Sequence, residues 1–372
     1  FVAKEVVPLE GELLRRMQHG GTGITSGEIR ELQRKARAFG FWGPSTPAEY
    51  GGMELGCVDQ ALLHVELGKT LVRFHLGGEA DNILYECDGP QRERYLLPTI
   101  AGDITSCFAV TEPDAGSDLT ALRTTARRDG GDWVINGEKT FITHGMDADL
   151  AIVVARTDPD ADHRTAFTAF LVERQMGFTS SPIPTMGQMR PASLTFDGVR
   201  VPAANVLGDV GEGFRLAMRW IGRGRYIQPA RAVGAAERLL GMAVEYASVR
   251  RTFGKPLKDH QAIQWMIADS AAELEAARYL TLLAAWTADR DDGTRIATSA
   301  IAKLEAARYA NDIADRVLQI HGGMGYSQEL PIQLWARDLR VLRIYEGSDE
   351  IQRRTLANQV FTGRYRLGGH LA

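Results

Sequence analysis

Glu346 is a candidate general base. It stands between Tyr345 and Gly347, directly before the acidic segment 348–350 (SDE). Apolar neighbours raise the pKa of a carboxyl group toward the range that is useful for a general base. Gly347 has no side chain, so a substrate carbonyl could reach the backbone amide at this bend. The alternative is a capping or solvated glutamate, because acids favour the first turn of a helix.

Two segments run from apolar residues into polar ones and could hold a flat ligand. Residues 108–118 (FAVTEPDAGSD) end in small and hydroxyl-bearing residues whose amides and hydroxyls are free to bond. Residues 141–145 (FITHG) offer a second pair of apolar and hydroxyl side chains at the end of a predicted strand. Each segment taken alone also fits an ordinary turn.

Two helix ends carry residues that suit a nucleotide. Arg250, Thr252 and Phe253 form a cationic and aromatic cluster appropriate to a diphosphate and a base. The helix macrodipole, however, attracts arginine to any C-terminus. Residues 319–326 (QIHGGMGY) end another helix in glycines, which either let a ligand approach the backbone or form a C-cap. Neither motif is decisive by itself.

Common metal and nucleotide motifs are missing from the sequence. Residues 158–162 (DPDAD) imitate the start of a calcium loop, but His163 and Ala169 replace the glycine and the bidentate glutamate that such a loop needs. The GxGxxG pattern fails at each glycine-rich segment, and no Walker A, GxSxG or HExxH sequence occurs. We therefore predict no metal site and no dinucleotide-binding βαβ unit.

Composition excludes several classes of protein. With 43 basic and 47 acidic residues, the net charge of −4 provides no basic field for a nucleic acid. Cys57, Cys87 and Cys107 are odd in number and form no CxxC pair, which favours free thiols and a cytoplasmic location. No apolar stretch approaches 18 residues, and the start lacks the pattern of a signal peptide, so we expect no membrane span.

Hydrophobic periodicity divides the 372 residues into three predicted domains. Residues 1–105 have helical periodicity, residues 106–210 carry short β-branched runs typical of a sandwich or barrel, and residues 211–372 return to the helical period of a bundle. The fold class is therefore mainly α with a central β domain. The individual segments predicted are a helix at 60–68, a type I′ hairpin at Asn136-Gly137 that joins 133–135 to 141–143, strands at 150–155 and 167–172, and helices at 261–286 and 296–320.

Six motifs in order resemble the acyl-CoA dehydrogenase family. They are FAVTEPDAGSD, KTFIT, RRTFG, QIHGGMGY, WARD and IYEGSDEIQ, and the resemblance covers about residues 50–352. It implies an N-terminal helical domain, a central β domain, a C-terminal four-helix bundle, one FAD per subunit and a homotetramer built as a dimer of dimers. The same order of helical and β segments follows independently from the hydrophobic periodicity.

The resemblance also implies roles for individual residues. Glu346 would be the catalytic base, because Gly224 occupies the position where some relatives place theirs. The residues implied for the flavin are Phe108, Val110, Thr111, Gly116, Ser117, Phe141 and Thr143. Those implied for the rest of FAD, partly across a dimer interface, are Arg250, Thr252, Phe253, His260, Gln261, Gln319, Gly322, Gly323, Ser348 and Glu350. Those implied for the substrate are Ser117, Arg225, Tyr345 and Gly347.

The implied reaction is the dehydrogenation of an acyl-CoA thioester to a 2-enoyl-CoA. Glu346 would abstract the α-proton while the β-hydride goes to the flavin, and electrons would pass to an electron-transfer flavoprotein. An oxygen-reactive relative on the same fold, such as an acyl-CoA oxidase, is the main alternative. A noncatalytic protein with weak or no flavin binding is a third, which the intact base and cofactor motifs disfavour.

A polar stretch near Pro229 bears on the acyl group. Proline cannot donate to the carbonyl of Arg225, so the helix should kink or restart there, at the level where relatives hold the acyl tail. Gln228 and Arg231 would share one face of the restarted helix. Either they line the pocket and select a polar or bulky acyl group, or Arg231 forms a structural ion pair with Glu79 or Asp81 of a predicted helix at 77–82.

Overall fold

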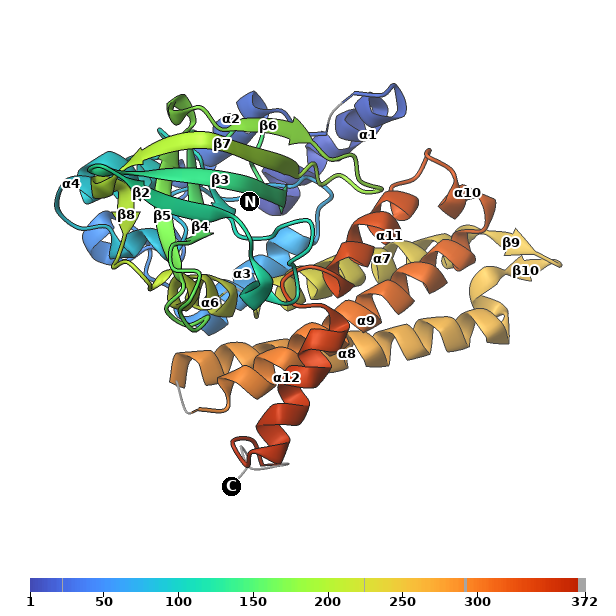
Figure 1. Cartoon of the computed structure of the whole chain (residues 1–372). Helices are drawn as coiled ribbons and strands as arrows, with labels where there is room; N and C mark the ends of the chain where they lie inside the picture. Colours follow the sequence, from blue (N-terminus) through green and yellow to red (C-terminus); the bar gives the residue numbers. More distant parts are fainter. Residues whose placement is uncertain (22, 224, 291–292, 367–372) are drawn as a thin grey trace.

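A computed structural model describes residues 1–21, 23–223, 225–290 and 293–366 of the chain. N-terminal helices and a central sheet lie side by side, and long C-terminal helices run beneath and away from them (Figure 1). This arrangement confirms the predicted order of helical, β and helical segments. None of the described helices combines the length and the apolar character that a membrane crossing requires.

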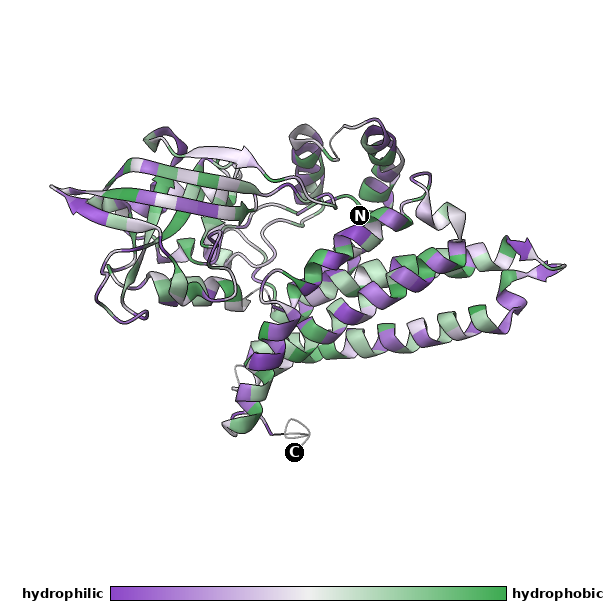
Figure 2. Ribbon diagram, turned by 45° about the vertical axis from the view of Figure 1, so that its right-hand side comes forward, coloured by the Kyte–Doolittle hydropathy of each residue, from purple (hydrophilic) through white to green (hydrophobic). Residues whose placement is uncertain are grey.

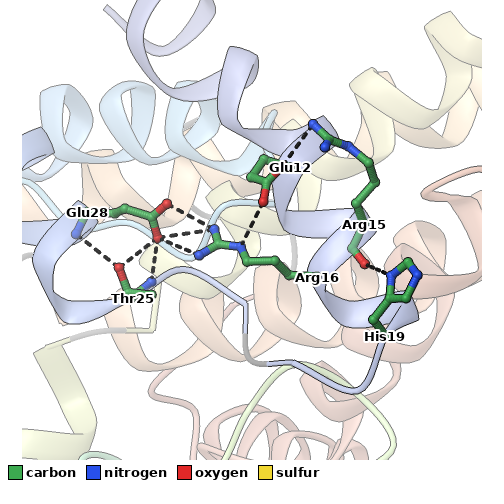
Figure 3. A network of polar contacts seen from close by, with 6 residues as sticks. All are labelled: Glu12, Arg15, Arg16, His19, Thr25 and Glu28. Carbon is green, nitrogen blue, oxygen red and sulfur yellow. Dashed lines mark hydrogen bonds and ion pairs between the residues drawn. The ribbon is translucent and has the colours of Figure 1, made fainter.

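The first two helices are joined by an ion pair. Thr25 caps α2 (Ser26–Ala38) in a capping box, because its hydroxyl accepts from the Glu28 N–H while the Glu28 carboxylate accepts from the Thr25 N–H. Arg16 of α1 (Glu10–Gln18) donates to the same carboxylate at 3.0 to 3.1 Å (Figure 3). The remaining helices of this region are α3 (Cys57–Gly68), which confirms the helix predicted at 60–68, α4 (Gly89–Gln91) and α5 (Leu97–Ala101).

The central sheet has eight strands in the order β6-β7-β3-β2-β4-β5-β8, with β1 parallel to β4. Burial of β3 and β7 alternates along much of each strand, and Figure 2 shows the corresponding change of colour. The inner strands β4 and β5 are buried on both faces, which explains their continuous apolar sequences. The strands are β1 (Ser106–Ala109), β2 (Thr125–Asp129), β3 (Asp132–Ile142), β4 (Leu150–Arg156), β5 (Phe167–Glu173), β6 (Thr179–Pro182), β7 (Ala192–Pro202) and β8 (Val206–Leu207).

The hairpin predicted at Asn136-Gly137 is wrong, whereas the strands predicted at 150–155 and 167–172 are confirmed as β4 and β5. Residues 132–142 form the single strand β3, which pairs with β2 on one side and β7 on the other. Gly137 lies at an irregularity in the β3–β7 register, and a Cβ there would lie 2.6 Å from the Thr124 hydroxyl oxygen. The glycine therefore permits a close approach within the sheet.

The C-terminal helices form a bundle in which α7, α8 and α9 pack lengthwise, with α3, α11 and α12 against them. The helices predicted at 261–286 and 296–320 are confirmed as α8 and α9. The restart predicted near Pro229 is also confirmed, because α7 begins at Ile227 and holds the proline in its first turn. The elements are α6 (Gly213–Arg223), α7 (Ile227–Val249), β9 (Arg251–Thr252), β10 (Lys255–Pro256), α8 (Gln261–Arg290), α9 (Arg295–His321), α10 (Gly323–Tyr326), α11 (Ile332–Arg340) and α12 (Asp349–Phe361).

Two glycines set the distance between α3 and α7. A Cβ at Gly234 would lie 2.0 Å from the Val65 carbonyl oxygen, and one at Gly68 would lie 2.4 Å from the Arg231 carbonyl oxygen. The two helix backbones therefore touch, which only glycine at the crossing allows. This contact places the Arg231 end of α7 directly against the N-terminal region.

Candidate functional site

Glu346 lies on a bend between the turn that follows α11 and the start of α12. Its φ is +50°, and Ser348, the next residue but one, caps α12 by accepting from the Ile351 N–H. The capping role considered for Glu346 therefore belongs to Ser348. The Glu346 N–H donates to no carbonyl or side chain in the described part of the chain. This bend thus presents a carboxylate and a free amide together.

Two residues that the sequence analysis did not identify hold the bend by hydrogen bonds to its backbone carbonyls. Lys303, 2% exposed on α9, donates from Nζ to the Gly347 carbonyl at 2.6 Å. Gln352 donates from Nε2 to the carbonyls of Glu346 and Gly347 at 3.2 and 3.1 Å. At Gly347, φ is +88° and a Cβ would lie 2.4 Å from the Gln352 Nε2. The glycine is thus needed for the bend itself as well as for access.

The Glu346 carboxylate lies in a half-buried polar network. Gln228 donates from Nε2 to its Oε1 at 3.1 Å, and the Tyr345 hydroxyl donates to the Gln228 Oε1 at 2.6 Å. Burial raises the pKa of Glu346 to about 7, although the Gln228 hydrogen bond and the charges of Lys303, Arg231 and Arg225 act in the opposite direction. A carboxyl group with this pKa can accept a proton at neutral pH.

The structure brings the two predicted polar turns together. The Thr140 N–H donates to the Thr111 carbonyl at 2.8 Å, so the turn after β1 lies beside the end of β3. Phe141, at φ +56°, is 61% exposed. Of the other predicted flavin residues, Phe108 and Val110 are buried, Thr111 is half-buried, and Gly116, Ser117 and Thr143 are exposed. The exposed Phe141 ring and the exposed hydroxyls of Ser117 and Thr143 therefore lie near the neighbouring ends of strands β1 and β3, a region called the sheet edge below.

The predicted nucleotide residues of the two helix ends, 250–261 and 319–323, lie at the far end of the bundle, beside β9 and β10 (Figure 1), whereas Ser348 and Glu350 lie at the start of α12. Phe253, at φ +47°, is 97% exposed, and Thr252 is within 3.3 Å of the His260 ring. Tyr246 stacks on His321 with ring centroids 4.4 Å apart, which joins this end of α7 to the end of α9. The exposed residues of this cluster are Arg250, Phe253, Gln261, Gln319, Gly322 and Gly323. Within one chain, this cluster is separate from the sheet edge.

The residues present fit FAD. The sheet edge offers the exposed Phe141 ring and the hydroxyls of Ser117 and Thr143 for a ring system, and the bundle end offers Arg250 and bare glycine backbone for a diphosphate. Phe141 and Phe253, two of the exposed phenylalanines, are uncovered in a single chain. Because the two clusters are apart, a cofactor that uses both must bridge two copies of the chain.

The predicted substrate residues surround the base. Arg225 is half-buried, and its Nε atom is buried without a partner among the described residues. Burial lowers the pKa of Arg225, and the charge of Glu346 acts in the opposite direction. Tyr345 reaches the base through Gln228, and Ser117 is exposed at the sheet edge. Gly224, the alternative position for a base, lies outside the described residues.

The predicted ion pair of Arg231 with Glu79 or Asp81 is wrong. Residues 77–82 do not form a helix, because Gly77 and Gly78 both have positive φ and the loop packs on Trp42. The Glu79 carboxylate accepts from the backbone and hydroxyl of Ser45. Asp81 accepts from Ser106 and Trp220. Arg231 instead donates from Nε to the His64 Nδ1 at 3.3 Å.

Comparison with known proteins gives matches along most of the chain. Models of the N-terminal, middle and C-terminal domains of acyl-CoA dehydrogenase match residues 1–103, 107–199 and 211–361. The chain is 37% identical to (R)-benzylsuccinyl-CoA dehydrogenase of Thauera aromatica, over 97% of this chain and 93% of that protein. It is 33% identical to the mitochondrial short-chain specific acyl-CoA dehydrogenase of Sus scrofa, over 97% of this chain and 87% of that protein. The structure of butyryl-CoA dehydrogenase from Megasphaera elsdenii aligns with a TM-score of 0.86 and 32% identity. The alignment covers 96% of this chain and 94% of that chain.

Proposed function

Because the chain belongs to the acyl-CoA dehydrogenase family, we propose that Glu346 is the base that removes the α-proton of a bound acyl-CoA. The chain is an FAD-dependent oxidoreductase that converts an acyl-CoA thioester into a 2-enoyl-CoA. The observation that carries the proposed role is the half-buried Glu346 carboxylate with a pKa raised to about 7, beside its own free amide.

The groups in and around the bend have separate roles in proton removal. The free Glu346 N–H can donate to the thioester carbonyl, which stabilises the negative charge that develops on that oxygen and acidifies the α-carbon. The Glu346 carboxylate then takes the α-proton, while Gln228 orients it and Lys303 and Gln352 hold the bend. The oxidant for the β-hydride would be supplied by the flavin ring of bound FAD.

The proposed cofactor residues fall into the two clusters described above. The sheet edge from Phe108 to Ser117, with Phe141 and Thr143, would contact the flavin. The bundle end with Arg250, Thr252, Phe253, His260 and Gln261 and the α9 end with Gln319, Gly322 and Gly323 would hold the ADP part between two copies. Ser348 and Glu350, at the start of α12, are proposed to support the cofactor beside the base.

An anaerobic titration tests the proposed function. Purified holoprotein is mixed with butyryl-, hexanoyl-, succinyl- and glutaryl-CoA in turn, and flavin absorbance is followed before and after admission of air. We expect at least one thioester to bleach the flavin, slow reoxidation by air, and rapid reoxidation by an electron-transfer flavoprotein. Rapid reoxidation by air would identify an oxidase instead. No bleaching by any thioester, with FAD bound, would count against acyl-CoA dehydrogenation.

The rate of flavin reduction should depend on pH with a midpoint near 7. The base must be ionised, and the pKa of Glu346 is raised to about 7. The rate under subsaturating substrate should therefore fall about tenfold per pH unit below 7 and level off above it. Stopped-flow measurements from pH 5 to 9 check this profile. A plateau that extends down to pH 5 would mean that the pKa of the base is not raised.

Replacement of Lys303 by methionine should move that midpoint upward. The positive charge of Lys303 lowers the pKa of Glu346, so its removal raises the pKa further. The lost bond to Gly347 also loosens the bend, and we expect flavin reduction at the plateau to fall roughly tenfold, about the value of one charged hydrogen bond. The exposed Lys4→Met variant is the control. An unchanged midpoint would show that Lys303 has only a structural role.

We propose a homotetramer and a cytoplasmic location. Large apolar side chains are exposed along the bundle, as expected for a face that other copies cover, and among them are Val249, Phe253, Trp265 and Tyr279. A cofactor shared between two copies requires at least a dimer, and a dimer of dimers would complete the tetramer. None of the three cysteines, all within the described residues, forms a disulfide, which suits a reducing compartment.

The acyl group is proposed to be polar or bulky. Gln228 bonds to the base, and Arg231, one turn along the same helix, carries no structural ion pair with a described residue. The name of the Thauera aromatica relative specifies a substituted succinyl group, which has a second carboxylate. A plain alkyl chain would offer no hydrogen-bond partner to the Arg231 guanidinium.

A further inference from the structure

The Gln228 amide bonds to two different partners with its two ends. Its Nε2 donates to the Glu346 Oε1 at 3.1 Å, and its Oε1 accepts from the Tyr345 hydroxyl at 2.6 Å. Each donor in this series of hydrogen bonds therefore points towards the base. Gln228 lies in the first turn of α7, on a different element from the bend that carries Glu346. The base is thus oriented from outside its own bend.

The Tyr345 hydroxyl determines which end of the amide faces the base. Burial and the charge of Glu346 raise the pKa of Tyr345, so the hydroxyl keeps its proton and can donate it to a hydrogen bond. The amide oxygen accepts from this hydroxyl, which leaves the amide N–H groups for Glu346. A carboxylate only accepts hydrogen bonds, whereas a protonated carboxyl group also donates one. The amide held in this way favours the ionised base.

The surroundings of Gln228 offer few competing partners. The hollow beside its side chain is lined by one further polar residue, Lys303, and otherwise by apolar ones. The apolar residues are Pro229, Ala232, Ala307 and Leu342. Lys303 donates to the Gly347 carbonyl instead of to the amide. Within the described part of the chain, the hydrogen-bond partners of the amide are therefore Tyr345 and Glu346 alone.

The two oxygens of the Glu346 carboxylate are not equivalent. Oε1 is engaged by Gln228, whereas no donor among the described residues bonds to Oε2. A proton on Oε1 would displace the N–H bond from Gln228. A proton on Oε2 leaves Oε1 as the carbonyl oxygen of the acid, which still accepts from Gln228. The contact therefore favours proton transfer to Oε2.

The charged groups that face Glu346 come from α9, α7 and the turn before α7. The charges of Lys303, Arg231 and Arg225 lower the pKa of Glu346, as the Gln228 bond does, whereas burial raises it to about 7. Among the described residues, Gln228 alone bonds to the carboxylate, and the three cations act through space. Removal of the Gln228 bond therefore destabilises the ionised form while the three charges stay in place.

We propose that Gln228, oriented by the Tyr345 hydroxyl, is a positioning residue that holds Glu346 through Oε1 and reserves Oε2 for the α-proton of the substrate. This inference rests on the proposed function of Glu346. The proton moves from the α-carbon to Oε2, and the electron pair of that C–H bond stays on the substrate. Neither Gln228 nor Tyr345 gains or loses a proton, so both act through Glu346.

Infrared difference spectroscopy tests the contact without turnover. The carboxyl band of protonated Glu346 is identified by its absence in Glu346→Gln, and its intensity is followed from pH 5 to 9 in holoprotein without substrate. In Gln228→Met the midpoint should rise by about one pH unit, because a donor to the charged form is lost. The C=O stretch should move to higher frequency, because Oε1 no longer accepts a hydrogen bond. An unchanged midpoint would overturn the proposal, and an unchanged frequency would overturn the assignment of the proton to Oε2.

Two further variants separate hydrogen bonding from packing. Gln228→Asn keeps an amide that is too short to join both partners, so it should shift the midpoint as Gln228→Met does, and it replaces that variant if Gln228→Met loses FAD or fails to fold. A natural midpoint in Gln228→Asn would overturn the proposal. Gln328→Met makes the same change at an exposed position and is the matched control, with no shift expected.

Tyr345→Phe tests the orientation of the amide. Without the hydroxyl, the amide can turn its carbonyl towards a protonated Glu346, so the midpoint should again rise. Because Tyr345 acts through Gln228, Tyr345→Phe should add no shift in the Gln228→Met background. Additive shifts in the double variant would overturn the orienting role of Tyr345.

The pH profile of flavin reduction separates this inference from the proposed function. If Glu346 is the base, the kinetic midpoint moves with the infrared midpoint in each variant. An infrared midpoint that moves in Gln228→Met while the kinetic midpoint stays would overturn the role of Glu346 as the base and support the Gln228 contact. A kinetic and an infrared midpoint that both stay near 7 in Gln228→Met would support the base and overturn this inference.

Discussion

Flavin reduction in Glu346→Gln is expected to be slower than in the natural protein by more than the roughly 10² to 10⁴ typical of a general base. Glutamine has nearly the same shape, and its carbonyl can still accept the hydrogen bond from Gln228. It cannot accept the α-proton. The fold, the bound FAD and the affinity for acyl-CoA should therefore remain, since the bend is held through Lys303 and Gln352 rather than through the carboxylate.

Anaerobic stopped-flow absorbance measures this rate, and FAD content and thermal unfolding verify that the variant is intact. Glu329→Gln makes the same chemical change at an exposed position and should reduce at the natural rate. Retention of more than about a tenth of the natural rate, equivalent to about 1.4 kcal/mol of barrier, would identify another residue as the base.

Replacement of Arg250 by alanine should release FAD and weaken subunit association. The Arg250 side chain is exposed at the end of α7, and none of the described residues bonds to its guanidinium. In the proposed site it meets the diphosphate of a cofactor shared by two copies. Charge-assisted hydrogen bonds contribute roughly 1.5 to 3 kcal/mol each, so FAD affinity should fall by one to two orders of magnitude.

Flavin absorbance after gel filtration and sedimentation of the same sample measure both effects. Arg30→Ala, an exposed arginine of α2, is the control, because it removes the same group far from the bundle end. Full FAD occupancy in an oligomer of unchanged mass would remove the proposed role of Arg250.

The predictions that depended on local pattern agree best with the structure. The strands β4 and β5 are short apolar runs, and α8 and α9 are long, rich in alanine and nearly free of glycine, so each follows from propensity and periodicity. The bend before Ser348 also follows from local chemistry, since a serine before two acids is typical of a helix start.

The failures concern contacts between distant segments. Asn136-Gly137 has the residues of a tight turn, yet β3 continues through it because β2 and β7 both pair with that strand. The sequence around Lys303 on α9 contains no motif that predicts its contact with the bend. Its hydrogen bond to the Gly347 carbonyl joins residues 44 positions apart. The partner of Gln228 is 118 positions away. Such tertiary contacts cannot be read from the pattern of one sequence.

The most direct test of the central claim is a single turnover with an acyl-CoA deuterated at the α-carbon. One equivalent of the thioester that reduces the flavin fastest is mixed anaerobically with holoprotein, and the product is analysed by mass spectrometry. The account predicts slower bleaching than with unlabelled substrate and one 2-enoyl-CoA per FAD that has lost one α-deuterium. A product that keeps both α-deuterium atoms, or bleaching without an enoyl-CoA, would contradict α-proton removal by Glu346.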